Sequence, residues 1–280
     1  MTTHFTSTEN YPVTFADTLV NDFEQPERTM GIDVSRWQDD NSTPQRMDFT
    51  KAYNAGARFV FIKASQACWM DEDMLYNWKS AKDALLLRGA YHFLDWTRSA
   101  VEQAHFFCNL LEKDPGELPP VVDFECRTGV PSDAVDKLEV VCDIIEERLN
   151  KYPIIYTSPY YWKEHGNVDP DIWWNLHDLW IANYEVSNPF VPAPWDTWTF
   201  WQWTDKGDGK LFGAESYGLD MNWFNGSFDA LIAYAGATIP DPEPEPPQPE
   251  PCKCAAMLEW LKKCPMFGDW NSELQVPESE

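Results

Sequence analysis

Two carboxylates stand two residues apart at the end of an apolar run, in the segment PPVVDFE at residues 119–125. If residues 121–125 form a strand, Asp123 and Glu125 point to the same face, with Cα atoms about 7 Å apart. Two acids so close cannot both ionise freely, so the pKa of one should rise. A proton donor beside a fixed anion is what hydrolysis of a glycosidic bond requires. A strand end with two solvated acids is the alternative interpretation.

Other carboxylates also lie at the ends of predicted strands. Asp33 lies in the segment GIDVS, which begins at residue 31, and Asp220 lies in GLDMN, which begins at residue 218. In a β/α barrel, the carboxyl ends of the strands meet at one end, where active sites lie. Strands one, four and eight would bring these two acids together with Asp123 and Glu125. One buried acid is often structural, whereas four at equivalent places favour a catalytic site.

Eight strand candidates, several of them continuous apolar runs, alternate with helical patterns in the early part of the chain. Residues 159–178 are irregular, and residues 185–197 leave no room for a helix. We therefore predict an α/β fold, an incomplete (β/α) barrel with eight strands and fewer helices. The strands are expected at residues 31–37, 58–65, 88–94, 120–125, 153–158, 179–184, 198–204 and 219–224.

A proline- and glutamate-rich stretch divides the chain. Residues 239–251 read IPDPEPEPPQPEP, the composition of a stiff, extended linker. We expect an N-terminal extension at 1–28, a catalytic domain at 29–238, this linker, and a short cysteine-containing tail at 252–280. The tail is too small for a core of its own, so we expect it to dock on a partner, on a second copy or on the body.

Composition limits the partners. The chain of 280 residues carries a net charge of −25, which excludes nucleic acid because phosphate binding needs clustered Lys and Arg. The sequence contains no run of about 18 apolar residues, so we expect no membrane span. Residues 1–28 lack the features of a secretion signal, and the seven cysteines are then expected to be reduced thiols. The tail cysteines lack the second ligand pair of a zinc site, so we expect neither metal nor cofactor.

The predicted strands together resemble the family 25 glycoside hydrolases, the Chalaropsis-type lysozymes that cleave peptidoglycan. Order and spacing agree from about residue 30 to 235, while residues 1–28 and 239–280 fall outside the resemblance. Each matching piece is weak alone, but eight in register are highly specific. They are GIDVSRWQ from residue 31, FVFIKAS from 59, GAYHF from 89, PPVVDFE from 119, PIIYTS from 153, LWIANY from 179, WTFWQW from 198 and DMN from 220.

The resemblance implies an N-acetylmuramidase, which cleaves the β-1,4 bond between N-acetylmuramic acid and N-acetylglucosamine in bacterial peptidoglycan. Glu125 would be the general acid. Asp123 would stabilise positive charge or orient the N-acetyl group of the substrate. Asp33 and Asp220 would hold this pair and tune its protonation.

The same resemblance implies that Tyr91, Tyr184, Gln202 and Trp203 line the substrate groove, although strand alternation directs Gln202 and Trp203 to opposite faces. The family often has KATEG after the second strand, whereas this chain has KASQA at residues 63–67, which changes the local groove. The i, i+2 acid pair does not suit inversion, which needs about 6.5–9.5 Å between the carboxyls. It is compatible with attack by the 2-acetamido oxygen of the substrate or by a carboxylate.

Two other functions fit parts of the sequence. Chitinase-like hydrolases also end a strand in Asp-x-Glu, but their longer run of acids is absent here. A non-catalytic saccharide-binding or virion structural protein could keep the fold, and the intact acids weigh against it. A phage endolysin is the expected role. It would be made in the host cytoplasm and would reach the wall through a holin-type pore or as a virion component.

Overall fold

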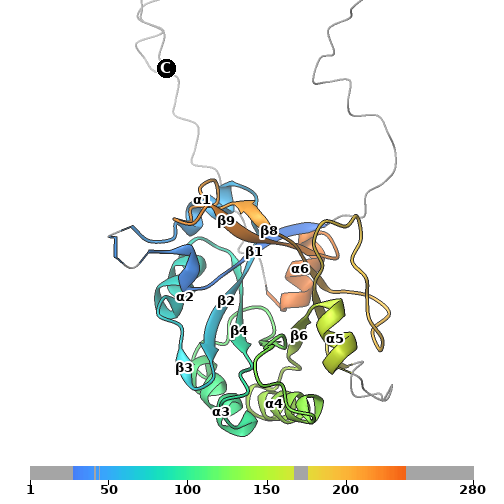
Figure 1. Cartoon of the computed structure of the whole chain (residues 1–280). Coiled ribbons are helices and arrows are strands. Elements are labelled where there is room, and N and C mark those ends of the chain that lie inside the picture. The colour runs from blue at the N-terminus through green and yellow to red at the C-terminus, as the bar shows by residue number, and fades with distance from the viewer. Residues whose placement is uncertain (1–27, 41, 44, 167–175, 238–280) are drawn as a thin grey trace, which may run out of the picture. The chain divides into compact units, whose positions relative to one another are not determined.

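The computed structural model describes residues 28–40, 42–43, 45–166 and 176–237, and its strands form one sheet (Figure 1). The strand order is β1-β9-β8-β7-β6-β5-β4-β2-β3, and β1 also pairs with β2. Eight strands therefore close into the predicted barrel, while β3 pairs only with β2. The strands are β1 (Thr29–Val34), β2 (Phe59–Gln66), β3 (Trp69–Met70), β4 (Leu87–Phe93), β5 (Val121–Asp123), β6 (Ile154–Thr157), β7 (Leu179–Ala182), β8 (Phe200–Asp208) and β9 (Gly218–Phe224).

Six α-helices accompany the strands in the described part of the chain, fewer than one for each strand. α3 and α4 lie side by side on the outside of the barrel (Figure 1). The predicted extension (except Arg28), linker and tail lie outside the described residues. The helices are α1 (Phe49–Asn54), α2 (Met74–Asp83), α3 (Ala100–Leu111), α4 (Ala134–Leu149), α5 (Pro159–His165) and α6 (Phe228–Ala235).

Helix α5 falls in a segment that the sequence pattern predicts to be irregular. The hydroxyl of Ser158 accepts a hydrogen bond from the backbone N–H of Tyr161 at 3.3 Å, and Pro159 occupies the first helical position. Both are standard features of a helix start, because Ser satisfies a free N–H and Pro has none to satisfy. The prediction of an irregular segment is therefore wrong for residues 159–165.

The last strand runs antiparallel to both of its neighbours in the barrel. β9 is antiparallel to both β8 and β1, because residues 209–217 are too few for a helical crossover. Asp220 thus lies near the start of its strand, not near the carboxyl end as predicted. The reversed direction still brings it to the same end of the barrel, where it is the register partner of Asp33.

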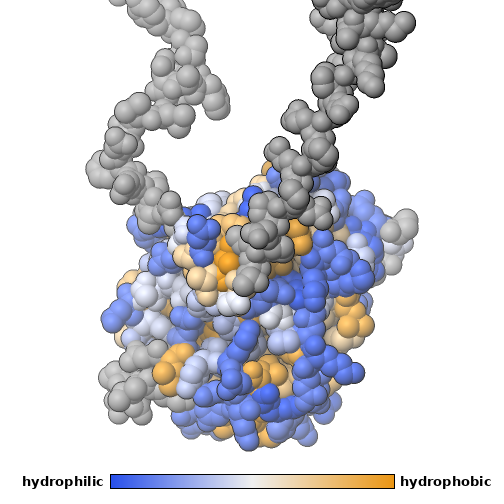
Figure 2. All heavy atoms as spheres, turned by 180° about the vertical axis from the view of Figure 1, so that it is seen from behind, coloured by the Kyte–Doolittle hydropathy of each residue, from blue (hydrophilic) through white to orange (hydrophobic). Residues whose placement is uncertain are grey.

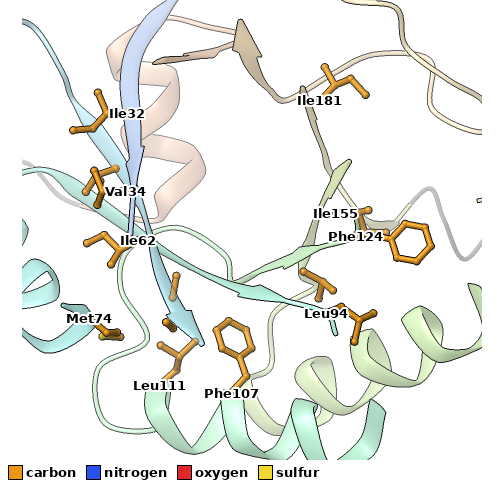
Figure 3. Packing of buried hydrophobic residues seen from close by; sticks show 14 of the residues in the cluster. Ile32, Val34, Ile62, Met74, Leu94, Phe107, Leu111, Phe124, Ile155 and Ile181 are labelled. Carbon is orange, nitrogen blue, oxygen red and sulfur yellow. The ribbon is translucent and has the colours of Figure 1, made fainter. Parts of the chain in front are cut away.

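The core has two layers, one on each side of the strand wall. The outer layer fills the space between strands and helices and includes Ile32, Ile62, Phe107 and Phe124, seen in Figure 3. Side chains one residue away point the other way, because successive residues of a strand alternate. Asp33 and Lys63 consequently face the inside of the barrel.

Aromatic rings fill the inner layer. The rings of Phe61 and Trp180 stack with centroids 4.3 Å apart. Residue 89 must be glycine here, because a Cβ atom would lie 2.4 Å from the Phe61 ring. Leu231 of α6 is fully buried in this inner layer, so α6 closes the barrel end that lies opposite the acids.

The surface is mostly polar. Figure 2 shows hydrophilic residues over much of the face opposite to that in Figure 1, with apolar patches between them. Within the described ranges, no helix has both the length and the apolar character needed to cross a membrane. The cysteines in these ranges are unpaired, namely Cys68, Cys108, Cys126 and Cys142.

Candidate active site

Asp33 on β1 accepts hydrogen bonds from two amide side chains. Nε2 of Gln202 on β8 and Nδ2 of Asn222 on β9 each lie 2.8 Å from its Oδ2 atom. Burial raises the pKa of Asp33 to about 6, although both hydrogen bonds favour the charged form. The Asp33 carboxyl group therefore gains or loses its proton near pH 6, within the pH range in which enzymes act.

Aromatic side chains hold the two amides in place. The amide oxygen of Gln202 accepts hydrogen bonds from the hydroxyls of Tyr156, at 2.8 Å, and Tyr184, at 2.5 Å. The amide oxygen of Asn222 accepts one from the indole N–H of Trp180 at 2.8 Å. With their oxygens occupied by donors, both amides turn their NH₂ groups toward Asp33.

Asp123 and Glu125 share the inner side of the barrel end. Asp123 is the last residue of β5 and Glu125 lies just beyond it, while Phe124 packs outward against Trp96 and Tyr161. Burial raises the pKa of Asp123 well above its usual value, and repulsion by Glu125 adds to the effect. Burial also raises the pKa of Glu125. The pair therefore retains a proton, as a general acid must.

One oxygen of Asp123 lacks a partner. Its Oδ1 atom is buried and accepts no hydrogen bond from any described residue. A buried acceptor without a donor costs about 1–3 kcal/mol. An N–H group of a bound ligand would remove that penalty, so Asp123 is well suited to hold an amide of the substrate.

Asp220 forms a second acid pair with Asp33. Burial raises the pKa of Asp220 to about 8, with further repulsion from Asp33, Asp205 and Glu125. Asp33 has two amide donors that stabilise its charge, so the proton of this pair resides on Asp220. Neighbouring acids whose pKa values differ in this way are typical of acid–base sites.

Lys63 lies beside the pair and Asp71 lies beside Lys63, and neither was predicted as a site residue from the sequence. Lys63 on β2 favours the charged forms of Asp123 and Glu125, and its Nζ atom donates to Oε1 of Gln66 at 2.9 Å. Burial lowers the pKa of Lys63, and the nearby carboxylates oppose this effect. Asp71 is only 1% exposed, and burial raises its pKa.

The structure brings together most of the predicted binding residues. Tyr91 faces the acids, since burial and then the charges of Asp33 and Asp123 raise the pKa of its hydroxyl. Trp203 lies apart, on the outer face of β8, where its ring stacks on Trp223 with centroids 6.0 Å apart. Within the described ranges, no group of three or more His, Cys, Asp or Glu side chains is arranged so that it could hold a metal ion.

One end of the barrel carries two pairs of carboxyl groups. One pair holds a proton, and the members of the other pair differ in pKa. These are features of an acid–base glycoside hydrolase. The comparison with known families agrees. Residues 32–210 match the model of the glycosyl hydrolases family 25. The chain belongs to this family and is a glycoside hydrolase.

Two named relatives and a solved structure align with most of the chain. Lysozyme M1 of Streptomyces globisporus is 30% identical, covering 74% of this chain and 71% of its own. An N,O-diacetylmuramidase of Arthroderma benhamiae is 30% identical, covering 73% and 86%. The solved structure of a muramidase from Trichobolus zukalii is 31% identical with a TM-score of 0.63, covering 75% of this chain and all of that one.

Proposed function

We propose that this protein is a peptidoglycan hydrolase, an N-acetylmuramidase that cleaves the β-1,4 bond between N-acetylmuramic acid and N-acetylglucosamine. The observation that carries the proposal is the coupled pair of Asp123 and Glu125, whose pKa values are both raised at the barrel end. The names of the relatives, lysozyme and N,O-diacetylmuramidase, support the choice of substrate.

In the first step, Glu125 donates its proton to the glycosidic oxygen while the bond from that oxygen to C1 breaks. The acetamido oxygen of the same sugar attacks C1 and forms a cyclic oxazolinium ion. Asp123 accepts a hydrogen bond from the acetamido N–H through its free Oδ1 atom. This bond favours the charged form of Asp123, so in the complex the proton of the pair resides on Glu125 and the Asp123 carboxylate offsets the positive charge. The leaving sugar carries the proton away on its new hydroxyl group.

In the second step, the Glu125 carboxylate takes a proton from water as that water attacks C1. The oxazolinium ring opens, the acetamido group is restored, and Glu125 is again protonated. Two displacements at C1 return the β configuration. The network of Asp33, Gln202 and Tyr184 holds the wall of the site in place throughout.

Peptidoglycan digestion tests this proposal. Purified wall is incubated with the protein, reduced with borohydride, and the new sugar ends are identified by mass spectrometry. Muramitol ends are expected. Glucosaminitol ends would identify a glucosaminidase or chitinase-like hydrolase, and no new ends from folded protein would support a non-catalytic saccharide-binding or virion protein.

We further propose the biological role of a phage endolysin that acts on the wall after release from the host cytoplasm. Production in bacteria with and without a holin tests it, since lysis should then depend on the pore. Lysis without the pore would refute this route, and detection of the protein in purified virions would support delivery as a virion component.

A further inference from the structure

One rim of the acid site carries alternating cations and aromatic rings, which we call the cation–aromatic rim and define as Arg36, Trp37, Lys63, Trp69 and Phe93. Arg36 and Trp37 follow β1, Lys63 lies within β2, Trp69 belongs to the short strand β3, and Phe93 ends β4. The rim is continuous with the acids, because Lys63 acts electrostatically on both Asp123 and Glu125.

Each cation contacts two rings. The guanidinium carbon of Arg36 lies 4.7 Å from the ring centre of Trp37 and 5.7 Å from that of Trp69. Nζ of Lys63 lies 5.7 Å from the ring centre of Trp69 and 5.1 Å from that of Phe93. Contacts of this kind hold the rings and charges in fixed positions without a ligand.

The indoles remain open to solvent. Trp37 is 69% exposed and Trp69 is 39% exposed. An indole face next to a catalytic pair is a suitable platform for the C–H face of a sugar ring, since stacking removes apolar surface from water on both sides. The acids and the rim thus form one continuous surface for a chain of sugars.

The charged side chains of the rim indicate which kind of sugar the rim binds. The whole chain carries a net charge of −25, yet this rim presents two cations, with the carboxylates of Glu72 and Asp71 beside them, and Gln66, which contacts Lys63, is neutral. The guanidinium group of Arg36 forms an ion pair with Glu72 at 3.0 Å, and both side chains are partly exposed. A guanidinium group held between two indoles can exchange that exposed partner for a carboxylate of a ligand.

We propose that Arg36, Trp37 and Trp69 form an accessory subsite that binds an N-acetylated sugar whose substituent carries a carboxylate, beside the scissile bond. This inference rests on the proposed function and specifies the substrate of the same site. Trp69 supports the sugar ring, and Arg36 binds the carboxylate. The subsite thereby favours glycans with acidic side groups over neutral glycans of the same length.

Binding to a protein that cannot cleave tests the subsite. In the Glu125→Gln background, the affinity for two probes is measured by calorimetry, one a neutral chito-oligosaccharide and the other a peptidoglycan oligosaccharide of equal length with its carboxylates. Adding Trp69→Ala should weaken both probes about tenfold, the size of a lost stacking contact. Adding Arg36→Gln should weaken the carboxylated probe about tenfold and the neutral probe far less.

Tyr152→Ala is the matched control, because Tyr152 is 42% exposed and precedes β6 at the opposite end of the barrel. It should leave both affinities unchanged. Glu72→Gln frees Arg36 from its surface partner and should strengthen the carboxylated probe. Equal affinities in the rim variants and their Glu125→Gln parent would overturn the subsite while leaving the muramidase proposal intact. A parent that binds neither probe would overturn both, and thermal melting of each variant checks that it folds.

Discussion

The substitution Gln202→Met removes one hydrogen-bond donor to the Asp33 carboxylate and replaces it with a side chain of similar size. The amide of Gln202 donates to Oδ2 of Asp33 at 2.8 Å and favours the ionised form. A hydrogen bond to a charged group contributes about 1.5–3 kcal/mol. One pKa unit corresponds to about 1.36 kcal/mol, so the pKa of Asp33 should rise by about one to two units.

The pKa of Asp33 should thus move from about 6 to between about 7 and 8. Carbon-13 NMR of the labelled aspartate carboxyls measures this shift directly. The acidic limb of the pH–rate profile for wall hydrolysis should move in the same direction, because a higher pH is then needed to ionise Asp33. Asn222, the remaining donor to Asp33, should keep its hydrogen bond in this variant.

Gln103→Met is the matched control. Gln103 is also buried, but it contacts His92 and the backbone of Asp95. This variant should leave the titration of Asp33 unchanged. An unchanged midpoint for Asp33 in Gln202→Met itself, with the fold intact, would refute the role given to the amide donors.

Three further predictions concern charge, stereochemistry and domain structure. The pKa of Asp220 is raised to about 8 in the folded protein, so its contribution to stability is greatest at acid pH and is lost as pH rises through about 8. Asp220→Asn should therefore raise the melting temperature at pH 8 more than at pH 4, and equal effects at both values would contradict this. NMR of the first-formed product should show the β anomer. An α anomer would mean that Asp33 or Asp220 activates water, and a trapped glycosyl adduct would make Asp123 the nucleophile. Deleting the residues after Gly236 should leave the melting transition nearly intact, because the stretch at 239–251 has the composition of a linker, and an unfolded product would refute this boundary.

The barrel and its acids could be predicted from sequence because both depend on local patterns. Strands buried on both faces read as apolar runs, and Asp123, Glu125 and Asp33 stand at or beside the ends of such runs. The direction of β9 has no such local signal. It follows from the short connection between β8 and β9, so Asp220 was assigned to the wrong end of its strand.

The hydrogen-bond network around Asp33 could not be predicted in the same way. Gln202 and Asn222 are 169 and 189 residues from Asp33 along the chain, and only closure of the barrel brings them together. Asn222 carries one weak signal, since it lies two residues from Asp220 on the same face of β9. The sequence does not predict that Lys63 and Asp71 lie near the acid site, because nothing in their spacing relates them to Asp123.

Glu125→Gln tests the central claim most directly, since it removes the transferable proton and keeps the shape of the side chain. Initial rates of reducing-end release from soluble peptidoglycan strands are compared with wild type at equal folded concentration. The rate should fall by about 10²–10⁴-fold, the usual contribution of a general acid, while the melting temperature does not fall. A rate near that of wild type would contradict the assignment of Glu125 as the general acid.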